Sequence, residues 1–182
     1  MFSSAFIYNQ INGGSDDGGT LEDAGNLIEN VGAATLKDFY WWSGLSAADS
    51  SKALGLVRSG FISETVGTEI YWMANSFQGS KEVLNSAFLL PAYDEFLISY
   101  RDRSASLTQS DNDTAISANG IFRPVILVRG KVKGVWNRMT KGDKVIVGTE
   151  FFQSPGKTTR NLLEKEVYRF GKFLNKKTSL HL

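Results

Sequence analysis

The chain has 182 residues, a net charge of +1, no cysteine and a single histidine. Its length allows one large or two small domains, and 42% hydrophobic with 21% charged residues is ordinary for a globular protein. The missing cysteines exclude disulfides and thiolate zinc sites, and a lone histidine at position 181 excludes histidine-based nucleophile systems and multi-histidine metal sites. We therefore expect no metal and no cofactor.

The N-terminal region, residues 1–20, is predicted to hold one strand followed by a flexible linker rich in glycine and aspartate. It has no positively charged region and no long apolar stretch, so we expect neither a signal peptide nor a membrane segment, and a cytoplasmic location. A first helix is predicted over 21–31, with Thr20 as its N-cap. A lone strand before such a linker suggests that the chain is cut from a longer architecture.

Residues 35–73 predict two short helices followed by a β-hairpin. Thr35 and Ser46 are good N-caps, and Gly44 and Gly60 interrupt or end the helices. The runs 61–66 and 69–73 are rich in β-formers, and a two-residue loop beginning with Gly67 suits a type II′ turn. Helix-turn-helix plus hairpin is the outline of a winged helix, which we expect to occupy 21–78.

The second of these helices, over 46–57, would be the recognition helix of a winged helix that reads DNA. Its outward positions offer few side chains for bidentate base contacts. We expect it to act as scaffold, with phosphate contacts limited to Lys52 and Arg58.

Residues 79–182 are predicted to form a small antiparallel β domain with a C-terminal helix, making the whole chain an α+β protein. A short apolar run stops at Pro91, and a short helix is expected near 96–98, behind two acidic residues. Asp94, Glu95 and Tyr100 are candidates for acid, base or orienting groups. Arg101 and Arg103, which flank an aspartate, suggest a phosphate clamp; helix capping and surface ion pairing are the simpler interpretation.

A basic hairpin is the strongest binding feature. Strands over 121–128 and 132–139 flank an Arg-Gly-Lys tip, and a third strand follows over 144–152. Basic residues crowd these strands: Arg123, Arg129, Lys131, Lys133, Arg138, Lys141 and Lys144. The hairpin is either a nucleic-acid probe or an edge protected by charge. The segment 158–174 then predicts an amphipathic packing helix.

Charge is divided unevenly between the two halves of the chain. Residues 1–99 carry four Lys and Arg against twelve Asp and Glu, a net of −8, whereas residues 100–182 carry sixteen against seven, a net of +9. Either the C-terminal half faces a polyanion, or the two halves attract each other.

Three strings, TLKDFYWWSGLSAADSSKAL, LLPAYDEFLISYRDRS and NGIFRPVILVRGKVKGVWNR, resemble in order and spacing the AlkZ-like winged-helix DNA-binding proteins. The resemblance spans 27–174 and implies a bacterial relative of glycosylases that excise alkylated purines and unhook crosslinks. It implies the C-terminal half of that architecture: the last winged helix and the β domain. The family's catalytic Gln-x-Gln pair would lie in the other half, and Gln109-Ser110-Asp111 does not match it. The chain also departs from the family at Val31 and Ala33.

Three hypotheses follow. The first is a DNA-repair protein that binds double-stranded DNA, intact or damaged, through the phosphates, using Arg101, Arg103, Arg129, Lys131, Lys133 and Arg138. The second is a DNA glycosylase, or the inactive half of one, with Asp94, Glu95 or Tyr100 at a lesion pocket. The third is a structural module that docks a separate N-terminal partner or associates with itself.

Overall fold

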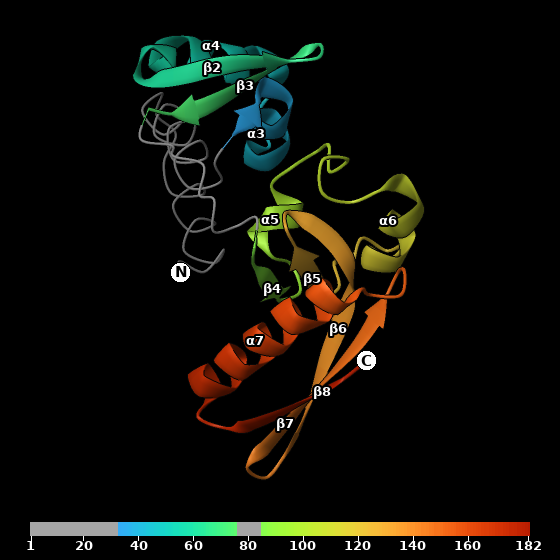
Figure 1. Ribbon diagram of the computed structural model, residues 1–182. Helices are drawn as coiled ribbons and strands as arrows, with labels where there is room; N and C mark the ends of the chain where they lie inside the picture. Colours follow the sequence, from blue (N-terminus) through green and yellow to red (C-terminus); the bar gives the residue numbers. More distant parts are fainter. Residues whose placement is uncertain (1–32, 76–84) are drawn as a thin grey trace. The chain divides into compact units, whose positions relative to one another are not determined.

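The computed structural model describes residues 33–75 and 85–182. The chain divides into two compact units: an N-unit of Met1–Gln78 with Glu95–Asp102, and a C-unit of Gly79–Asp94 with Arg103–Leu182 (Figure 1). The strand, linker and helix predicted over 1–31 lie outside the described residues.

Two capped helices form the N-unit together with a small sheet. Helix α3 (Leu36–Ser43) begins at Thr35, which makes a capping box with Asp38, and ends at Gly44 in the left-handed conformation, φ 72°. Helix α4 (Ala47–Val57) begins at Ser46, whose hydroxyl accepts from the Asp49 amide at 3.1 Å. Both predicted N-caps and the Gly44 break are thus confirmed.

The N-unit sheet is antiparallel, with strand order β1-β3-β2. Strand β1 (Ala34–Thr35) pairs with β3 (Glu69–Ala74), and β3 pairs with β2 (Phe61–Val66), which follows the 3₁₀ turn η1 (Arg58–Gly60). Gly67, at φ 63°, takes the positive φ that the first residue of a type II′ turn needs. The hairpin predicted from sequence is therefore present.

A segment distant in sequence completes the N-unit. Helix α5 (Glu95–Ile98) lies in this segment, and the Trp41 indole donates to the Ile98 carbonyl at 3.0 Å. The Arg101 amide donates to Asp38 Oδ1 at 2.9 Å, although Asp38 is 63 residues away in sequence. These contacts place the 95–102 segment against α3.

The C-unit is built on a five-stranded sheet with order β4-β5-β6-β7-β8. Its strands are β4 (Ala87–Leu90), β5 (Val125–Val128), β6 (Lys131–Lys141), β7 (Lys144–Phe151) and β8 (Lys177–His181). The first four are antiparallel, but β8 pairs parallel to β7. The prediction of an antiparallel domain is wrong at this edge, because helix α7 (Lys157–Leu174) is a crossover that brings the chain back in the same direction.

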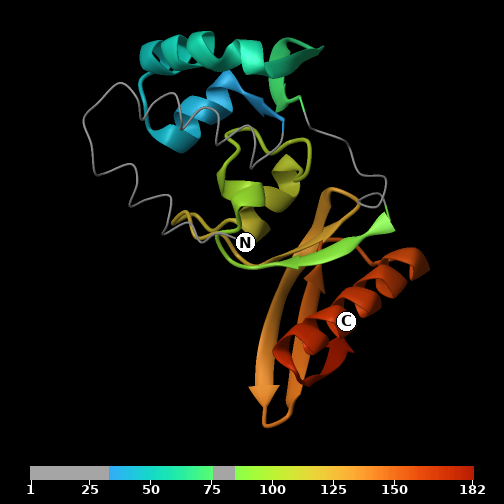
Figure 2. The same cartoon turned by 90° about the vertical axis from the view of Figure 1, so that its left-hand side faces the viewer.

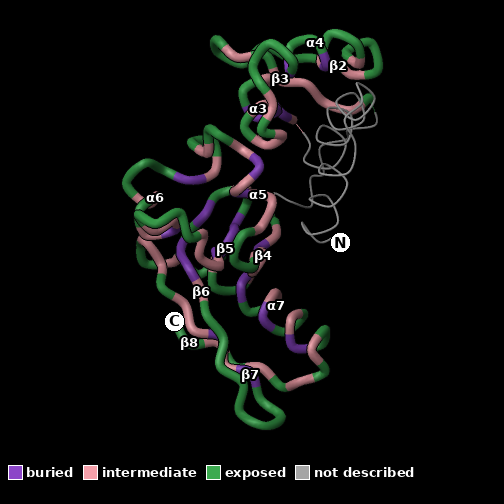
Figure 3. The backbone as a smooth tube through the Cα atoms, turned by 180° about the vertical axis from the view of Figure 1, so that it is seen from behind, coloured by how far each residue is buried: buried purple, intermediate pink, exposed green. Residues whose placement is uncertain are grey.

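Helix α7 covers one face of this sheet (Figure 2). The core between them consists of Ala87, Ile126, Val128, Val145, Val147, Leu163 and Val167. Figure 3 shows buried residues in β5, in the first half of β6 and along the inner side of α7, while the β6–β7 tip is exposed. None of the helices in the described part is long and apolar enough to cross a membrane.

Within the described part of the C-unit, helix α6 (Gln109–Ala115) lies near the opposite face of the sheet, at the end where β6 begins. Val125, Leu127, Val132 and Val135 are buried there. The polar composition of 104–117 predicts a loop, but α6 forms within this segment. The helix was missed because its residues, QSDNDTA, carry no apolar periodicity, and only Ala115 is buried.

Candidate nucleic-acid interface

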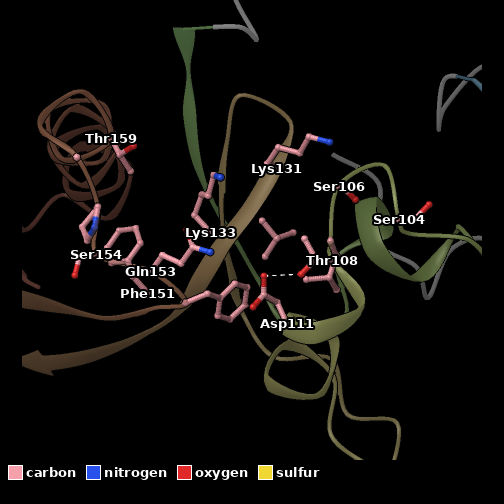
Figure 4. A pocket seen from close by; sticks show the side chains of 15 residues that line it. Ser104, Ser106, Thr108, Asp111, Lys131, Lys133, Phe151, Gln153, Ser154 and Thr159 are labelled. Atoms are coloured by element: carbon pink, nitrogen blue, oxygen red, sulfur yellow. Dashed lines mark hydrogen bonds between the residues drawn. The ribbon is translucent and has the colours of Figure 1, made fainter.

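A polar groove of about 420 Å³ opens in the C-unit where strand β6 begins. One wall is the 104–108 segment with the start of α6, and the other is the loop after β7 with the first turn of α7. In Figure 4 the side chains of Lys131 and Lys133 lie between these walls. The groove therefore gathers two of the lysines singled out from sequence.

A β-bulge positions the two lysines. Leu127 pairs with Val132 and Ile126 with Gly134, so Lys133 is the extra residue on β6. Both lysine side chains are exposed, and Lys131 Nζ donates to the Ala105 carbonyl across the groove. The bulge thus lets both lysines line the groove.

The start of α7 adds to the positive potential. Gly156 is its N-cap and makes no side-chain cap hydrogen bond to the first-turn amides of this 18-residue helix. The N-terminus of such a helix carries about half a positive charge and exposes amide donors. The groove thus combines two ammonium groups with a positively polarised helix end.

One carboxylate opposes this charge. Asp111 lines the groove, and its Oδ2 accepts from Thr108 Oγ1 at 2.7 Å. Hydroxyl groups from Ser104, Ser106 and Thr159 also line it. Two ammonium groups, a helix N-terminus and several hydroxyls against one acid suit a phosphate, which accepts hydrogen bonds through every outward oxygen.

The other basic residues in the described part of the C-unit lie outside the groove. Arg129 occupies the β5–β6 turn at φ 54°, and its backbone amide donates to the Ser86 carbonyl at 3.1 Å. Arg138 lies farther along β6, with its guanidinium 5.8 Å from the centre of the Phe170 ring on α7. Arg129 thus lies at the turn beside Lys131, whereas Arg138 packs on the helix side of the sheet.

The two arginines of the predicted clamp belong to different units. Arg101 is in the N-unit, where its guanidinium donates to the Tyr40 hydroxyl and stacks 5.6 Å from that ring. Arg103 is in the C-unit, 5.1 Å from the Phe122 ring. Both guanidiniums therefore rest on aromatic rings of their own unit.

The three candidate catalytic residues are also divided between the two units. Asp94 belongs to the C-unit, while Glu95 begins α5 in the N-unit and accepts from Ser99 Oγ at 2.6 Å. Burial, reinforced by Asp38 and Tyr71, raises the pKa of Tyr100 to about 12. At neutral pH the Tyr100 hydroxyl is protonated, so it is suited to donating a hydrogen bond and not to acting as a base.

Lys52 and Arg58 are exposed in the N-unit. Lys52 lies 3.9 Å from Asp49 on the same helix, a loose exposed ion pair, and Arg58 begins the turn after α4. Within the described residues, no three His, Cys, Asp or Glu side chains gather to hold a metal ion.

Sequence reasoning missed the uncharged half of the groove. Gln153, Ser154 and Thr159 line it, from the loop and first turn of α7. A Ser-Pro-Gly run before a strongly amphipathic helix was the signal that marked this helix start. Its proximity to Lys131 depends on the sheet register, which one sequence does not reveal.

Comparison with known proteins gives one family and one fold. The family model "DNA glycosylase AlkZ-like" matches residues 24–173. The solved structure of Streptomyces sahachiroi DNA glycosylase AlkZ superposes with a TM-score of 0.69 at 16% identity. That match covers 91% of this chain and 46% of the other, so this chain spans about half the length of that protein. Among curated proteins, none matches significantly.

Proposed function

Because this chain belongs to the AlkZ-like DNA glycosylase family, we propose that it binds double-stranded DNA through phosphate contacts centred on the groove at the start of β6. The observation that carries the proposal is the convergence of Lys131, Lys133 and the α7 N-terminus on one polar groove. Arg129 at the adjacent turn would contact a neighbouring phosphate.

Binding of this kind reads charge and not sequence. Lysine and helix-end contacts to phosphate position a protein on the duplex without distinguishing bases. The two capped helices and hairpin of the N-unit would serve as a winged helix whose second helix is scaffold, with Lys52 and Arg58 as its only phosphate contacts. The protein would work beside the bacterial chromosome, in the cytoplasm, in the repair of DNA.

Charge removal in the groove tests the proposal. Lys131→Gln with Lys133→Gln should weaken binding to a 20-base-pair duplex roughly tenfold or more at 0.1 M salt, because each phosphate contact contributes about 0.9 to the salt slope. Asp111→Asn removes the opposing carboxylate and should strengthen binding. Fluorescence anisotropy measures both changes.

A matched control removes the same charge elsewhere. Lys165→Gln with Lys172→Gln alters two exposed lysines on α7, away from the groove, and should change affinity less than threefold. If the control weakens binding as much as the groove variant, only net charge matters and the groove has no special role.

The family match favours a second candidate function, excision of an alkylated base. We propose Asp94, Glu95 and Tyr100 as candidates for groups that orient water or donate a hydrogen bond in that reaction. The test is incubation with an alkylated duplex and detection of the free base and the abasic site. Lack of release under conditions in which the duplex is bound would contradict excision by this chain.

Docking of a separate partner, or self-association, stays a prediction. Sedimentation equilibrium at two protein concentrations would test self-association, and a monomer at both would contradict it.

A further inference from the structure

The far end of the β6–β7 hairpin carries a row of lysines across three strands. Lys141 on β6 pairs with Lys144 on β7, and Lys144 pairs with Lys177 on β8. Residues in register point to the same face of a sheet, so the three side chains lie side by side. All three are exposed.

This row lies on the face of the sheet opposite α7. The neighbouring residue Val145 is buried against α7, and alternation therefore turns Lys144 to the opposite side. Beyond the row on that same side, Met139 is 55% exposed and Asn137 is exposed as well. Within the described part of the C-unit, the side chains around the row are therefore exposed to solvent.

Fold stability does not explain the row. Like charges directly opposite each other destabilise a sheet. Lysines do protect edge strands from aggregation, which accounts for Lys177 on the edge strand β8. Lys144 lies on β7, between β6 and β8, so edge protection does not account for it.

Within residues 33–75 and 85–182, Lys141, Lys144 and Lys177 are not among the lysines that pair with an acidic side chain, such as Lys37 with Glu69 and Lys52 with Asp49. The nearest acid in sequence, Asp143 in the turn, offers its backbone carbonyl to the Lys177 amide at 3.0 Å. The row is thus a concentrated positive charge suited to a polyanion.

The spacing between the two basic ends of β6 suggests which polyanion. Lys131 and Lys141 are the first and last residues of the strand, and at about 3.3 Å per residue they lie about 33 Å apart along it. One helical turn of B-DNA rises about 34 Å. Phosphates on one side of a duplex therefore recur with about the spacing of the two lysine groups.

We propose that Lys141, Lys144 and Lys177 form a second phosphate site, reached by the same DNA duplex that binds at the groove, about one turn away. This inference rests on the proposed function and deepens it by setting a minimum length for the duplex. A duplex rises about 3.4 Å per base pair, so one shorter than about ten base pairs cannot reach both ends.

The experiment compares two DNA lengths and two variants by fluorescence anisotropy. The DNAs are a hairpin with a 7-base-pair stem and a 20-base-pair duplex. The test variant is Lys144→Thr with Lys177→Thr, which keeps strand-forming residues, and the matched control is Lys165→Gln with Lys172→Gln on α7. At each length, the dissociation constant of the variant is divided by that of the wild type. This ratio cancels the effect of the larger number of binding sites on longer DNA.

The proposal predicts a length-dependent loss. The test variant should bind the 20-base-pair duplex at least tenfold more weakly at 0.1 M salt, with a salt slope shallower by about 1.8. It should bind the 7-base-pair stem within twofold of wild type, and the control should stay within threefold on both DNAs. Its melting temperature should equal or exceed that of wild type, because two like charges are removed.

Other outcomes overturn the proposal in distinguishable ways. If the test variant binds both DNAs as the wild type does, the second phosphate site is contradicted, while the proposed function is not. An equal loss on both lengths shows that one duplex does not bridge the two ends. If the wild-type protein binds neither DNA, both the proposed function and this inference are contradicted. If the test variant does not fold, Lys141→Ala beside the turn makes the same comparison.

Discussion

Replacement of Asp38 by asparagine should loosen the N-unit. Asp38 is only 4% exposed, yet its carboxylate accepts three hydrogen bonds. Oδ2 accepts from the Thr35 amide at 3.0 Å and from the Thr35 hydroxyl at 2.7 Å, and Oδ1 accepts from the Arg101 amide at 2.9 Å. The side chain therefore caps α3 and holds the 95–102 segment against it.

An asparagine cannot satisfy all of these donors. Whichever way the amide is turned, its NH₂ group faces a backbone N–H of either Thr35 or Arg101, and one buried donor loses its acceptor. An unsatisfied buried donor costs about 1–3 kcal/mol, and the bonds that remain lose the strength that the negative charge gave them. We expect the free energy of unfolding of the N-unit to fall by about 2–4 kcal/mol.

Urea denaturation, followed by tryptophan fluorescence, measures this loss, and hydrogen exchange locates it. Amides of residues 95–102 should exchange faster in Asp38→Asn, while those of β5 and α7 should not. Asp49→Asn is the control, because Asp49 is exposed at the start of α4 and should cost less than about 1 kcal/mol. A loss below 0.5 kcal/mol with unchanged exchange at Arg101 would refute the reasoning.

Three further predictions concern single residues. Because burial raises the pKa of Tyr100 to about 12, the unfolded chain loses this proton first, and stability should fall between about pH 10 and pH 12. In Tyr100→Phe, the free energy of unfolding should fall by about 1–2 kcal/mol less over this pH range than in the wild type. Parallel plots of stability against pH for the two proteins would contradict this prediction. Gly134→Ala would place a Cβ 2.3 Å from the Glu150 carbonyl oxygen of β7, so we expect the free energy of unfolding, measured in urea, to fall by about 1–3 kcal/mol. No loss would mean that β6 and β7 move apart at little cost. Trp136→Phe removes the indole donor to the Leu90 carbonyl, 2.8 Å away, and should cost about 1 kcal/mol by the same measurement, with an unchanged midpoint as the contrary result.

Local sequence signals predicted the local elements well. Thr35 and Ser46 as N-caps, Gly44 as a break and Gly67 at a tight turn act within four residues of themselves, so their roles are visible in the sequence. Helix α7 was equally clear, because its apolar stripe repeats at helical spacing.

Long-range pairing was not visible in the same way. The parallel strand β8 is short and polar, and only the crossover through α7 decides its direction. The contact between Asp38 and Arg101 joins positions 63 residues apart, and no local pattern indicates it.

In the candidate site, too, the sequence indicated the residues but not the way in which strand pairing brings them together. Lys131 and Lys133 stood out as part of a basic hairpin, and the structure places both at one groove. The row formed by Lys141, Lys144 and Lys177 depends on strand register, so the sequence offered the residues without their arrangement.

Titration of a fluorescent 20-base-pair duplex with the wild-type protein at several salt concentrations tests the central claim most directly. If the protein binds DNA through phosphates, the logarithm of the association constant should fall linearly with the logarithm of salt concentration, with a slope that corresponds to roughly four or more phosphates. Binding that does not change with salt, or no binding even at low salt, would contradict the account.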